Sequence, residues 1–248
     1  MSDIIENLTW DSEFFGFPIG QFETHQLKDE DQLRLALTWA RDRGLRCLYF
    51  QAHPDDGATV TLVEKHGFHL VDVRLVLARA LPARLEAPDT DKIRITPPKE
   101  AEIERLAEIA AQISHVSRFA FDQNFGLAQA EALYRLWIQK AMAGYADAVW
   151  VARQPLHDEA MGFVTGTLRD KTASLQLIGV HSNYQGQGVG KALVDAALYW
   201  AQTQGASHMQ VITQARNVPA QQLYQKKGFL TISVMLYYHK WFDNPAAD

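Results

Sequence analysis

Apolar positions follow two patterns along the chain. Short runs of β-branched, aromatic and other apolar residues are typical of strands, and stretches with an apolar residue every three or four positions are typical of helices. In the first third of the chain these patterns predict strands at 19–22, 45–52 and 70–77 and helices at 29–43 and 59–66. The aromatic-rich segment 14–18 is expected to form a turn.

The rest of the chain repeats this alternation. Strands are predicted at 93–96, 148–153, 161–168, 174–180, 208–213 and 229–239, and helices at 98–114, 128–144, 188–204 and 219–227. Hairpins followed by strand–helix–strand crossovers indicate an α/β (α+β) fold with a mixed, mostly antiparallel sheet flanked by helices. The prolines and charges of 81–91 predict a linker between domains at 1–81 and 92–240.

Two segments resemble each other, because 62–68 and 223–229 each end a helix with Gly-Phe and lead into an alternating strand. One interpretation is a common way of ending a helix, and the other is that the first half is a degenerate copy of the second. The first copy has no glycine-rich loop, and Val63 stands where the second has Tyr224. We therefore expect residues 1–80 to contribute structure and no catalytic group.

Composition narrows the classes of function. Hydrophobic residues make up 47% and charged residues 21% of the chain, as in a globular protein with a substantial core. A net charge of −5 argues against nucleic-acid or anionic-membrane partners. Cys47 is the only cysteine, so an intrachain disulfide and a cysteine-rich metal site are excluded. Residues 1–10 contain acids and no apolar signal segment, so we expect a cytoplasmic protein.

A glycine-rich loop joins the predicted strand 174–180 to the predicted helix 188–204. A helix start offers unpaired N–H groups and a positive dipole end, and glycines let a ligand approach the backbone, so such loops hold phosphates. The nucleoside triphosphate motif fails because Gln185 and Ala192 replace its first Gly and its Ser/Thr. The dinucleotide motif fails because Lys191 replaces its third Gly. A turn without a ligand is the remaining alternative.

The spacing Gln185, Gly188, Gly190 resembles the coenzyme A diphosphate loop of the GNAT (GCN5-related N-acetyltransferase) superfamily. The resemblance covers about 93–239, because Asn217 opens the next helix and Tyr224 precedes Gly-Phe at the family's spacing. It implies a GNAT fold, a degenerate GNAT-like N-terminal half, acetyl-CoA as cosubstrate and no metal. The coenzyme contacts that it implies are Ile178, Val180, Gln185, Gly186, Gln187, Gly188, Val189, Gly190, Lys191, Asn217 and Tyr224.

The resemblance also implies a role for Tyr224 in acetyl transfer from a thioester to an amine. Strand-end N–H groups would face the developing oxyanion, and Tyr224 would act as general acid toward the departing thiolate. The alternative is that Tyr224 is an ordinary core residue. The family's usual base is a carboxylate on the strand before the loop, and 174–180 contains none. A water chain or a residue from elsewhere would take the proton, and we expect His181 to be a loop residue.

The segment between the helices 98–114 and 128–144 is the expected acceptor site. Ser117-Arg118-Phe119 followed by Asp122, and then Tyr134-x-x-Trp137, is similar to the TDP-fucosamine (TDP-4-amino-4,6-dideoxygalactose) acetyltransferases of this superfamily. That resemblance extends to the N-terminal Leu-Thr-Trp and Phe-Phe-Gly at 8–10 and 14–16. It implies substrate contacts from Ser117, Arg118, Phe119 or Phe121, and Asp122. The alternative is that these aromatics pack the loop and Arg118 pairs with a surface acid.

The expected function is therefore acetyl-CoA-dependent N-acetylation of a small-molecule amine, with the 4-amino group of a TDP-linked deoxyamino sugar as the leading acceptor. Three alternatives remain: an enzyme acting on another small amine, amino acid or protein N-terminus, a non-catalytic acyl-CoA-binding protein, and a non-catalytic interaction domain. We expect no nucleic-acid or membrane partner, and a monomer or homodimer.

Overall fold

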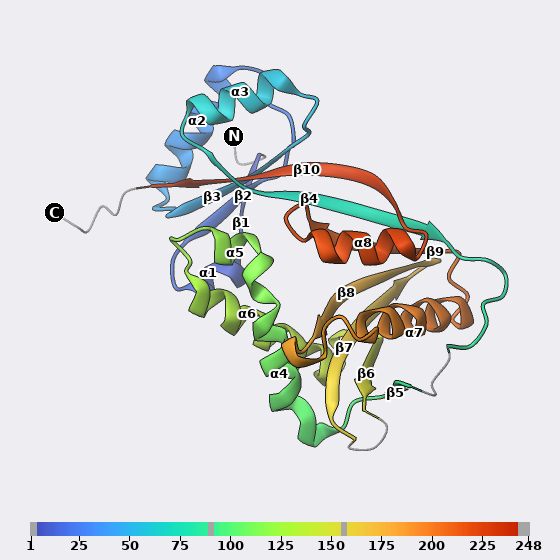
Figure 1. The fold of residues 1–248 in the computed structure, drawn as a ribbon. Coiled ribbons are helices and arrows are strands. Elements are labelled where there is room, and N and C mark those ends of the chain that lie inside the picture. Colours follow the sequence, from blue (N-terminus) through green and yellow to red (C-terminus); the bar gives the residue numbers. More distant parts are fainter. Residues whose placement is uncertain (1–3, 89–91, 155–157, 243–248) are drawn as a thin grey trace. The chain divides into compact units, whose positions relative to one another are not determined.

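The computed structural model describes residues 4–88, 92–154 and 158–242 (Figure 1). The chain divides into two compact units, Met1–Arg74 with Val234–Asp248, and Leu75–Ser233. Two strands, β4 (His69–Ala80) and β10 (Leu230–Trp241), run from one unit into the other. The second unit contains the glycine-rich loop and every residue assigned above to a ligand.

The first unit is a small mixed sheet with helices. Parallel β2 and β3 are central, β1 pairs antiparallel with β2, and β10 pairs antiparallel with β3. Its core joins apolar residues of α2 and α3 to those of the sheet, including Leu33, Leu48 and Val63. The remaining bounds in this unit are β1 (Ile5–Asn7), α1 (Thr9–Phe15), β2 (Ile19–Phe22), α2 (Glu30–Asp42), β3 (Cys47–Ala52) and α3 (Gly57–Lys65).

The first two residues of the aromatic segment 14–18 end a helix, α1, and the expected turn follows them at Gly16. The Ser12 hydroxyl donates to the Leu8 carbonyl at 2.7 Å and accepts from the Ile19 amide at 2.9 Å, which joins the helix to β2. Gly16, at φ +79°, ends the helix in a left-handed conformation. Aromatic residues have modest helix propensity, so this helix depends on tertiary contacts that local sequence does not reveal.

The second unit holds a larger sheet with the strand order β4-β9-β8-β7-β6-β5. The pairs β5–β6, β6–β7 and β7–β8 are antiparallel, and the pair β8–β9 is parallel. The mixed, mostly antiparallel sheet predicted from the sequence is confirmed here. Its remaining elements are β5 (Arg94–Thr96), the short helix Glu100–Glu102, α4 (Ile103–Gln112), the turn Ser114–Val116, α5 (Arg118–Phe121), α6 (Leu127–Lys140), the turn Ala141–Tyr145, β6 (Ala148–Arg153), β7 (Ala160–Arg169), β8 (Thr172–Val180), the turn Ser182–Tyr184, α7 (Val189–Thr203), β9 (His208–Gln214) and α8 (Val218–Lys226).

Helices cover both faces of this second sheet. Ala152 and Val164 belong to the core that includes α7, whereas their neighbours Val151 and Phe163 belong to the core that includes α4 and α6. Since successive side chains of a strand point to opposite faces, α7 lies on one face and α4 and α6 on the other (Figure 1).

The linker predicted at 81–91 is only partly described, since 89–91 lie outside the described residues. Leu81 donates to the Ser207 carbonyl at 2.8 Å, so the chain stays attached to the second unit just after β4. The division into domains at 1–81 and 92–240 stays a prediction, as does the degenerate copy in the first half.

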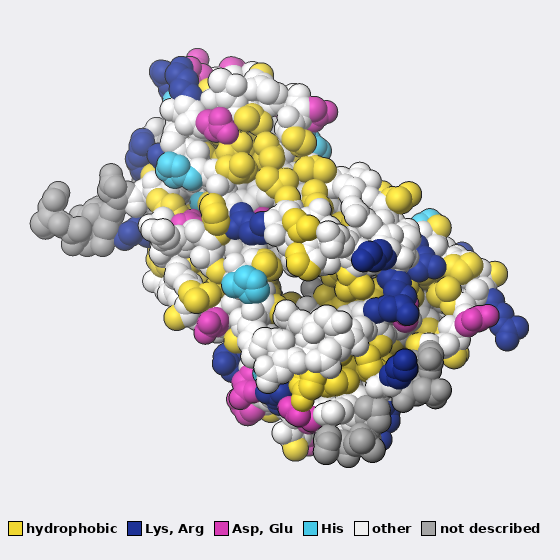
Figure 2. All heavy atoms as spheres, in the orientation of Figure 1, with side chains coloured by type: hydrophobic (Ala, Val, Ile, Leu, Met, Phe, Trp, Pro, Cys, Tyr) yellow, Lys and Arg dark blue, Asp and Glu magenta, His cyan; other side chains and the backbone are white. Residues whose placement is uncertain are grey.

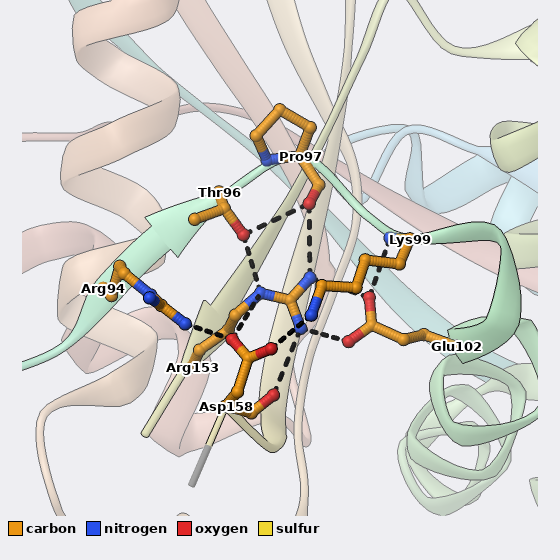
Figure 3. Close-up of polar contacts among 7 residues, drawn as sticks. All are labelled: Arg94, Thr96, Pro97, Lys99, Glu102, Arg153 and Asp158. Atoms are coloured by element: carbon orange, nitrogen blue, oxygen red, sulfur yellow. Dashed lines mark hydrogen bonds and ion pairs between the residues drawn. The ribbon is translucent and has the colours of Figure 1, made fainter. Parts of the chain in front are cut away.

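A buried arginine ties the start of the second unit to the β6–β7 hairpin (Figure 3). Arg153 donates from Nε to Thr96 Oγ1 at 2.7 Å, from Nη2 to the Pro97 carbonyl at 3.2 Å, and to both oxygens of Glu102. Arg94 and Lys99 pair with Asp158 beside it. The hydrogen bond from Arg153 holds the pKa of Glu102 below its ordinary value. This network is structural and uses none of the residues assigned to ligands.

Candidate active site

The strands β8 and β9 separate partway along their length. Their parallel pairing runs from Thr172 opposite His208 to Leu175 opposite Val211. On the other edge of β8, Leu175 and Leu177 pair with consecutive residues of β7, so Gln176 is an extra residue that forms a β-bulge. Bulges redirect strands and recur beside active sites. The bulge coincides with the end of the β8–β9 pairing. Among the described residues, 176–180 therefore have no partner strand on the edge that faces β9.

The free edge of β8 carries the backbone groups that the sequence assigned to the coenzyme. Leu177 donates to Thr165 Oγ1 at 3.1 Å and His181 donates to the Met161 carbonyl at 2.9 Å, both toward β7. Backbone groups alternate between the two edges of a strand. The N–H and C=O of Ile178 and Val180 therefore face the gap beside β9, where they can pair with an extended ligand.

The glycine loop leads from this edge into α7. Gly186 and Gly188 have φ of +74° and +84°, and a Cβ at either position would meet nothing within 4 Å. The first helical bond of α7 is donated by Ala192 to Gly188, so the N–H groups of 189–191 precede the helical ladder. Open space in front of unpaired N–H groups at a positive dipole end fits a diphosphate.

Gly190 differs from the other two glycines. A Cβ here would lie 3.2 Å from Leu223 Cδ2 and 3.8 Å from Val180 Cγ2. Glycine at 190 allows α7 to pack closely against α8. Only 186 and 188 border open space.

Two glutamines brace the loop. Gln185 Nε2 donates to the Val180 carbonyl at 3.2 Å, which closes the turn between β8 and α7. Gln187 Nε2 donates to the Asn183 carbonyl at 2.8 Å. Val189 is buried in the core, whereas Lys191 is exposed. Among the loop side chains predicted to contact the coenzyme, the structure thus gives Gln185, Gln187 and Val189 structural contacts and leaves Lys191 on the surface.

Tyr224 lies on α8, and its side chain is 2% exposed. It packs in the same core as Val189 of α7, and its ring is 5.9 Å from that of Phe229. Burial raises the pKa of the Tyr224 hydroxyl well above its ordinary value. The hydroxyl therefore stays protonated at any physiological pH and can serve as a hydrogen-bond donor.

Asn217 caps α8. Its Oδ1 accepts from the Ala220 amide at 3.3 Å, as expected of asparagine at a helix start. The cap does not use its side-chain amino group, which remains the donor by which it could contact a ligand. Asn217 therefore has a structural role of its own whether or not it contacts the coenzyme.

His181 follows the last residue of β8 and is a loop residue, as expected, and its side chain is buried. Its Nδ1 accepts from the Asn183 amide at 3.2 Å. Because Nδ1 is an acceptor, the proton of the neutral ring sits on Nε2. The ring thus has no second acceptor nitrogen for an incoming amine, so this contact argues against His181 as the base.

Ser117 and Asp122 shape the expected acceptor segment. Ser117 Oγ accepts from the Ala120 amide at 3.1 Å and so caps α5. Asp122 Oδ1 accepts from the backbone and the side chain of Asn124 at 3.1 and 2.9 Å. Both side chains are buried. Their contacts set the course of the backbone at both ends of α5.

The aromatics of this segment have different exposures. Phe119 is 6% exposed and packs against Phe125, whereas Phe121 is 55% exposed. The Arg118 guanidinium lies 4.4 Å from the centre of the Phe119 ring. Arg216, which the sequence analysis missed, lies 4.0 Å from the centre of the Phe121 ring. Arg216 could have been chosen from the sequence, because it lies between the end of β9 and Asn217, the residue that caps α8. Tyr134 is a core residue 4.8 Å from the Trp137 ring.

The residues described contain no group of His, Cys, Asp and Glu that could hold a metal ion. Within the same ranges, every helix is too short or too polar to cross a membrane.

Comparison with known proteins relates part of the chain to one family. The model of the acetyltransferase (GNAT) family matches residues 112–229, which contain β8, the glycine loop and Tyr224. A crystal structure of a GCN5-related N-acetyltransferase from Sphaerobacter thermophilus superimposes with a TM-score of 0.68 at 15% identity, over 96% of this chain and 76% of that one. At that identity the likeness shows the fold alone.

Two curated relatives are concerned with sugars by name. Spore coat polysaccharide biosynthesis protein SpsD of Bacillus subtilis (strain 168) is 25% identical over 187 residues, 75% of this chain and 63% of that protein. The dTDP-fucosamine acetyltransferase of Escherichia coli O6:H1 is 26% identical over 227 residues, 90% of this chain and 92% of that protein.

Proposed function

We propose that the chain, whose residues 112–229 match the model of the acetyltransferase (GNAT) family, transfers the acetyl group of acetyl-CoA to a primary amine. The observation that carries this proposal is the gap between β8 and β9, which opens at the Gln176 bulge and ends at the glycine loop. An extended thioester ligand would lie along the free edge of β8 with its diphosphate at residues 186–191.

The residues of the chain would act in a simple order. Backbone groups of Ile178 and Val180 hold the pantetheine amides and place the thioester carbonyl. N–H groups at the end of β8 stabilise negative charge that develops on its oxygen. Tyr224 donates to the sulfur as the carbon–sulfur bond breaks. Because burial raises the pKa of Tyr224 above that of the departing thiol, about 8.5, complete proton transfer to the thiolate is unfavourable. Tyr224 therefore stabilises the thiolate by a hydrogen bond that strengthens as negative charge accumulates on the sulfur.

The proton of the attacking amine needs an acceptor other than His181. The segment 174–180 has no carboxylate, and Nδ1 of His181 already accepts a hydrogen bond. We therefore assign this proton to water in the open part of the gap.

We propose that the acceptor is the 4-amino group of a TDP-linked deoxyamino sugar. The names of the two curated relatives and the segment 117–122 support this choice. A nucleotide diphosphate needs a local cation and its base an aromatic face. Phe121 is the exposed aromatic of the segment, and Arg118 and Arg216 lie against the two phenylalanines. Because Phe119 is buried, Phe121 is the better candidate for stacking.

The test is steady-state kinetics with acetyl-CoA and the TDP-linked 4-amino sugar, the free amino sugar, amino acids and polyamines. The nucleotide sugar should be the best acceptor, because binding energy from the remote nucleotide helps to position the amine. Arg118→Ala should raise its KM about tenfold or more and leave the KM of acetyl-CoA nearly unchanged.

Arg169→Ala is the matched control, since Arg169 is an exposed arginine at the opposite end of the β7–β8 pair from Val180. It should change neither KM. Equal rates with the free sugar, or no activity with the nucleotide sugar, would overturn this acceptor. Turnover with another amine would then identify the acceptor class and leave the acetyltransferase assignment intact.

A further inference from the structure

From the bulge at Gln176 to the last loop glycine, Gly190, the sequence contains no acidic residue, lysine or arginine. In Figure 2 the surface over the glycine loop is accordingly mostly white, the colour of the backbone and of uncharged polar side chains. A ligand along this segment would therefore be held chiefly by backbone N–H and C=O groups. The direction in which those groups point then decides whether the ligand can bind.

The bulge sets that direction. Leu175 lies in the core that includes α7, whereas Leu177, two residues later, packs against the core that includes α4 and α6. Regular alternation would put both side chains on one face, so the extra residue Gln176 shifts the strand by one position. Ile178 packs against the α7 core again. Without the shift, the backbone groups of Ile178 and Val180 would face β7 and not the gap.

Thr165 of β7 lies opposite the bulge, and its hydroxyl bonds to Leu177. Its Oγ1 accepts from the Leu177 amide at 3.1 Å and donates to the Leu177 carbonyl at 3.5 Å. Thr165 is 2% exposed. Because a buried N–H group without a partner is costly, this hydroxyl stabilises Leu177 in its shifted position.

A second threonine of β7 contacts the extra residue itself. Thr167 Oγ1 accepts from Gln176 Nε2 at 3.0 Å. Gln176 is exposed, so water can replace this bond, whereas water has no access to the buried Thr165 hydroxyl. The bulge therefore depends more on Thr165 than on Thr167.

We propose that Thr165 is a positioning residue for acetyl transfer: its hydroxyl holds the bulge and so keeps the backbone groups of Ile178 and Val180 directed toward the coenzyme. It acts through Leu177 and does not itself contact the ligand. The inference rests on the proposed binding of acetyl-CoA in the β8–β9 gap.

Amide hydrogen exchange of the full chain, measured by NMR, tests the geometry. In the unsubstituted protein the Leu177 amide should be protected, whereas the Ile178 and Val180 amides should exchange rapidly and become protected when coenzyme A is added. Thr165→Val removes the hydroxyl and keeps a side chain of similar shape, and the Leu177 amide should then exchange about tenfold faster or more. Thr165→Ser keeps the hydroxyl and should preserve the protection.

Calorimetry with coenzyme A measures the effect on binding. Thr165→Val should weaken coenzyme A binding about three- to tenfold, the value of one misplaced hydrogen bond, and Thr165→Ser should change it less than about twofold. Thr59→Val is the matched control, because Thr59 is also buried and its hydroxyl accepts from the Leu27 amide at 3.1 Å in the first unit. It should lower the melting temperature as much as Thr165→Val does, by about 2–4 °C or more, and leave coenzyme affinity unchanged.

An unchanged coenzyme affinity in Thr165→Val would overturn the role of this hydroxyl, as would an equal loss in Thr165→Ser or in Thr59→Val. A Leu177 amide without protection in the unsubstituted protein would overturn it as well. Absence of coenzyme A binding by the unsubstituted protein would contradict the proposed function. The exchange of the Leu177 amide in Thr165→Val would then still decide whether the hydroxyl holds the bulge.

Discussion

At the residue scale, the glycine loop shows what spacing can and cannot predict. Gly186 and Gly188 combine positive φ with open space, as a phosphate-binding loop requires. Gly190 is a glycine for another reason: the absence of a side chain at this position leaves room for Leu223 of α8. The sequence alone does not distinguish the three glycines. The contact between Gly190 and Leu223 joins positions far apart in the chain and is visible only in the structure.

A matched pair of substitutions separates backbone strain from ligand contact. Gly188 and Gly205 lie at the two ends of α7, with φ of +84° and +82° and nothing within 4 Å of a Cβ. Alanine at either position should cost about 1–2 kcal/mol of unfolding free energy. Only Gly188→Ala should weaken coenzyme A binding, by about tenfold or more, because its Cβ enters the space for the diphosphate.

Chemical denaturation and calorimetry on both variants check this prediction. Coenzyme affinity that is unchanged in both variants would mean that the loop is a turn without a ligand. A similar loss of affinity in both would mean that strain alone disturbs the site.

The buried side chains at the site were the least predictable. Tyr224 was identified through its spacing from Asn217 and Gly228, but nothing local shows that it is 2% exposed. Ser117 and Asp122 were chosen as polar ligands, and the structure shows both forming local caps and turns. Short polar residues serve both purposes with the same atoms, so the pattern cannot distinguish them.

At the element scale, the strands and helices of the second unit follow the predicted order closely. Their alternating and helical periodicities are strong because each element has one buried face. The bulge at Gln176 was not predictable, because it depends on the register of β7 against β8. The most informative feature of the site, the gap beside β9, therefore emerges only from the pairing.

The Arg153 network that ties β5 and the helix 100–102 to the β6–β7 hairpin leads to a prediction about acid stability. The hydrogen bond from Arg153 lowers the pKa of Glu102 in the folded protein. Its stabilisation is complete above the unfolded value of about 4.3 and is lost as pH falls through the lower folded pKa. Glu102→Gln should lower the unfolding free energy at pH 7 by about 3 kcal/mol.

The same substitution should also reduce the loss of stability as pH falls below the unfolded pKa of Glu102, about 4.3. Glu108→Gln is the control, because Glu108 pairs with Arg105 at an exposed site and should matter little. Denaturant titrations of the three proteins at several pH values measure both effects. An unchanged acid profile in Glu102→Gln would show that the Arg153 pair does not govern it.

At the scale of the whole molecule, the two compact units do not follow the order of the residues along the chain. Residues 234–248 belong to the same compact unit as 1–74, and β4 and β10 each contribute to both units. The linker prediction at 81–91 followed local composition, which cannot show that the last strand pairs with β3. Compositional signals mark exposed loops, and only pairing shows which distant segments fold together.

The family match covers part of the chain, and that part contains all the residues proposed to act in acetyl transfer. The match at 112–229 includes every residue assigned to the thioester. The first 80 residues contribute no assigned catalytic group and stay, by prediction, structural. The central claim is thus confined to one unit: acetyl-CoA lies along β8, and Tyr224 assists the departure of its sulfur.

The kinetics of Tyr224→Phe test that claim most directly. This substitution removes one oxygen from a buried ring, and Tyr199→Phe on α7 is the control for loss of a tyrosine hydroxyl. Tyr224→Phe should lower kcat about 10²- to 10⁴-fold with little change in the KM of acetyl-CoA. In the unsubstituted enzyme, the raised pKa of Tyr224 means that its ionisation should not reduce kcat below about pH 10. An unchanged kcat in Tyr224→Phe with intact coenzyme binding would contradict the account.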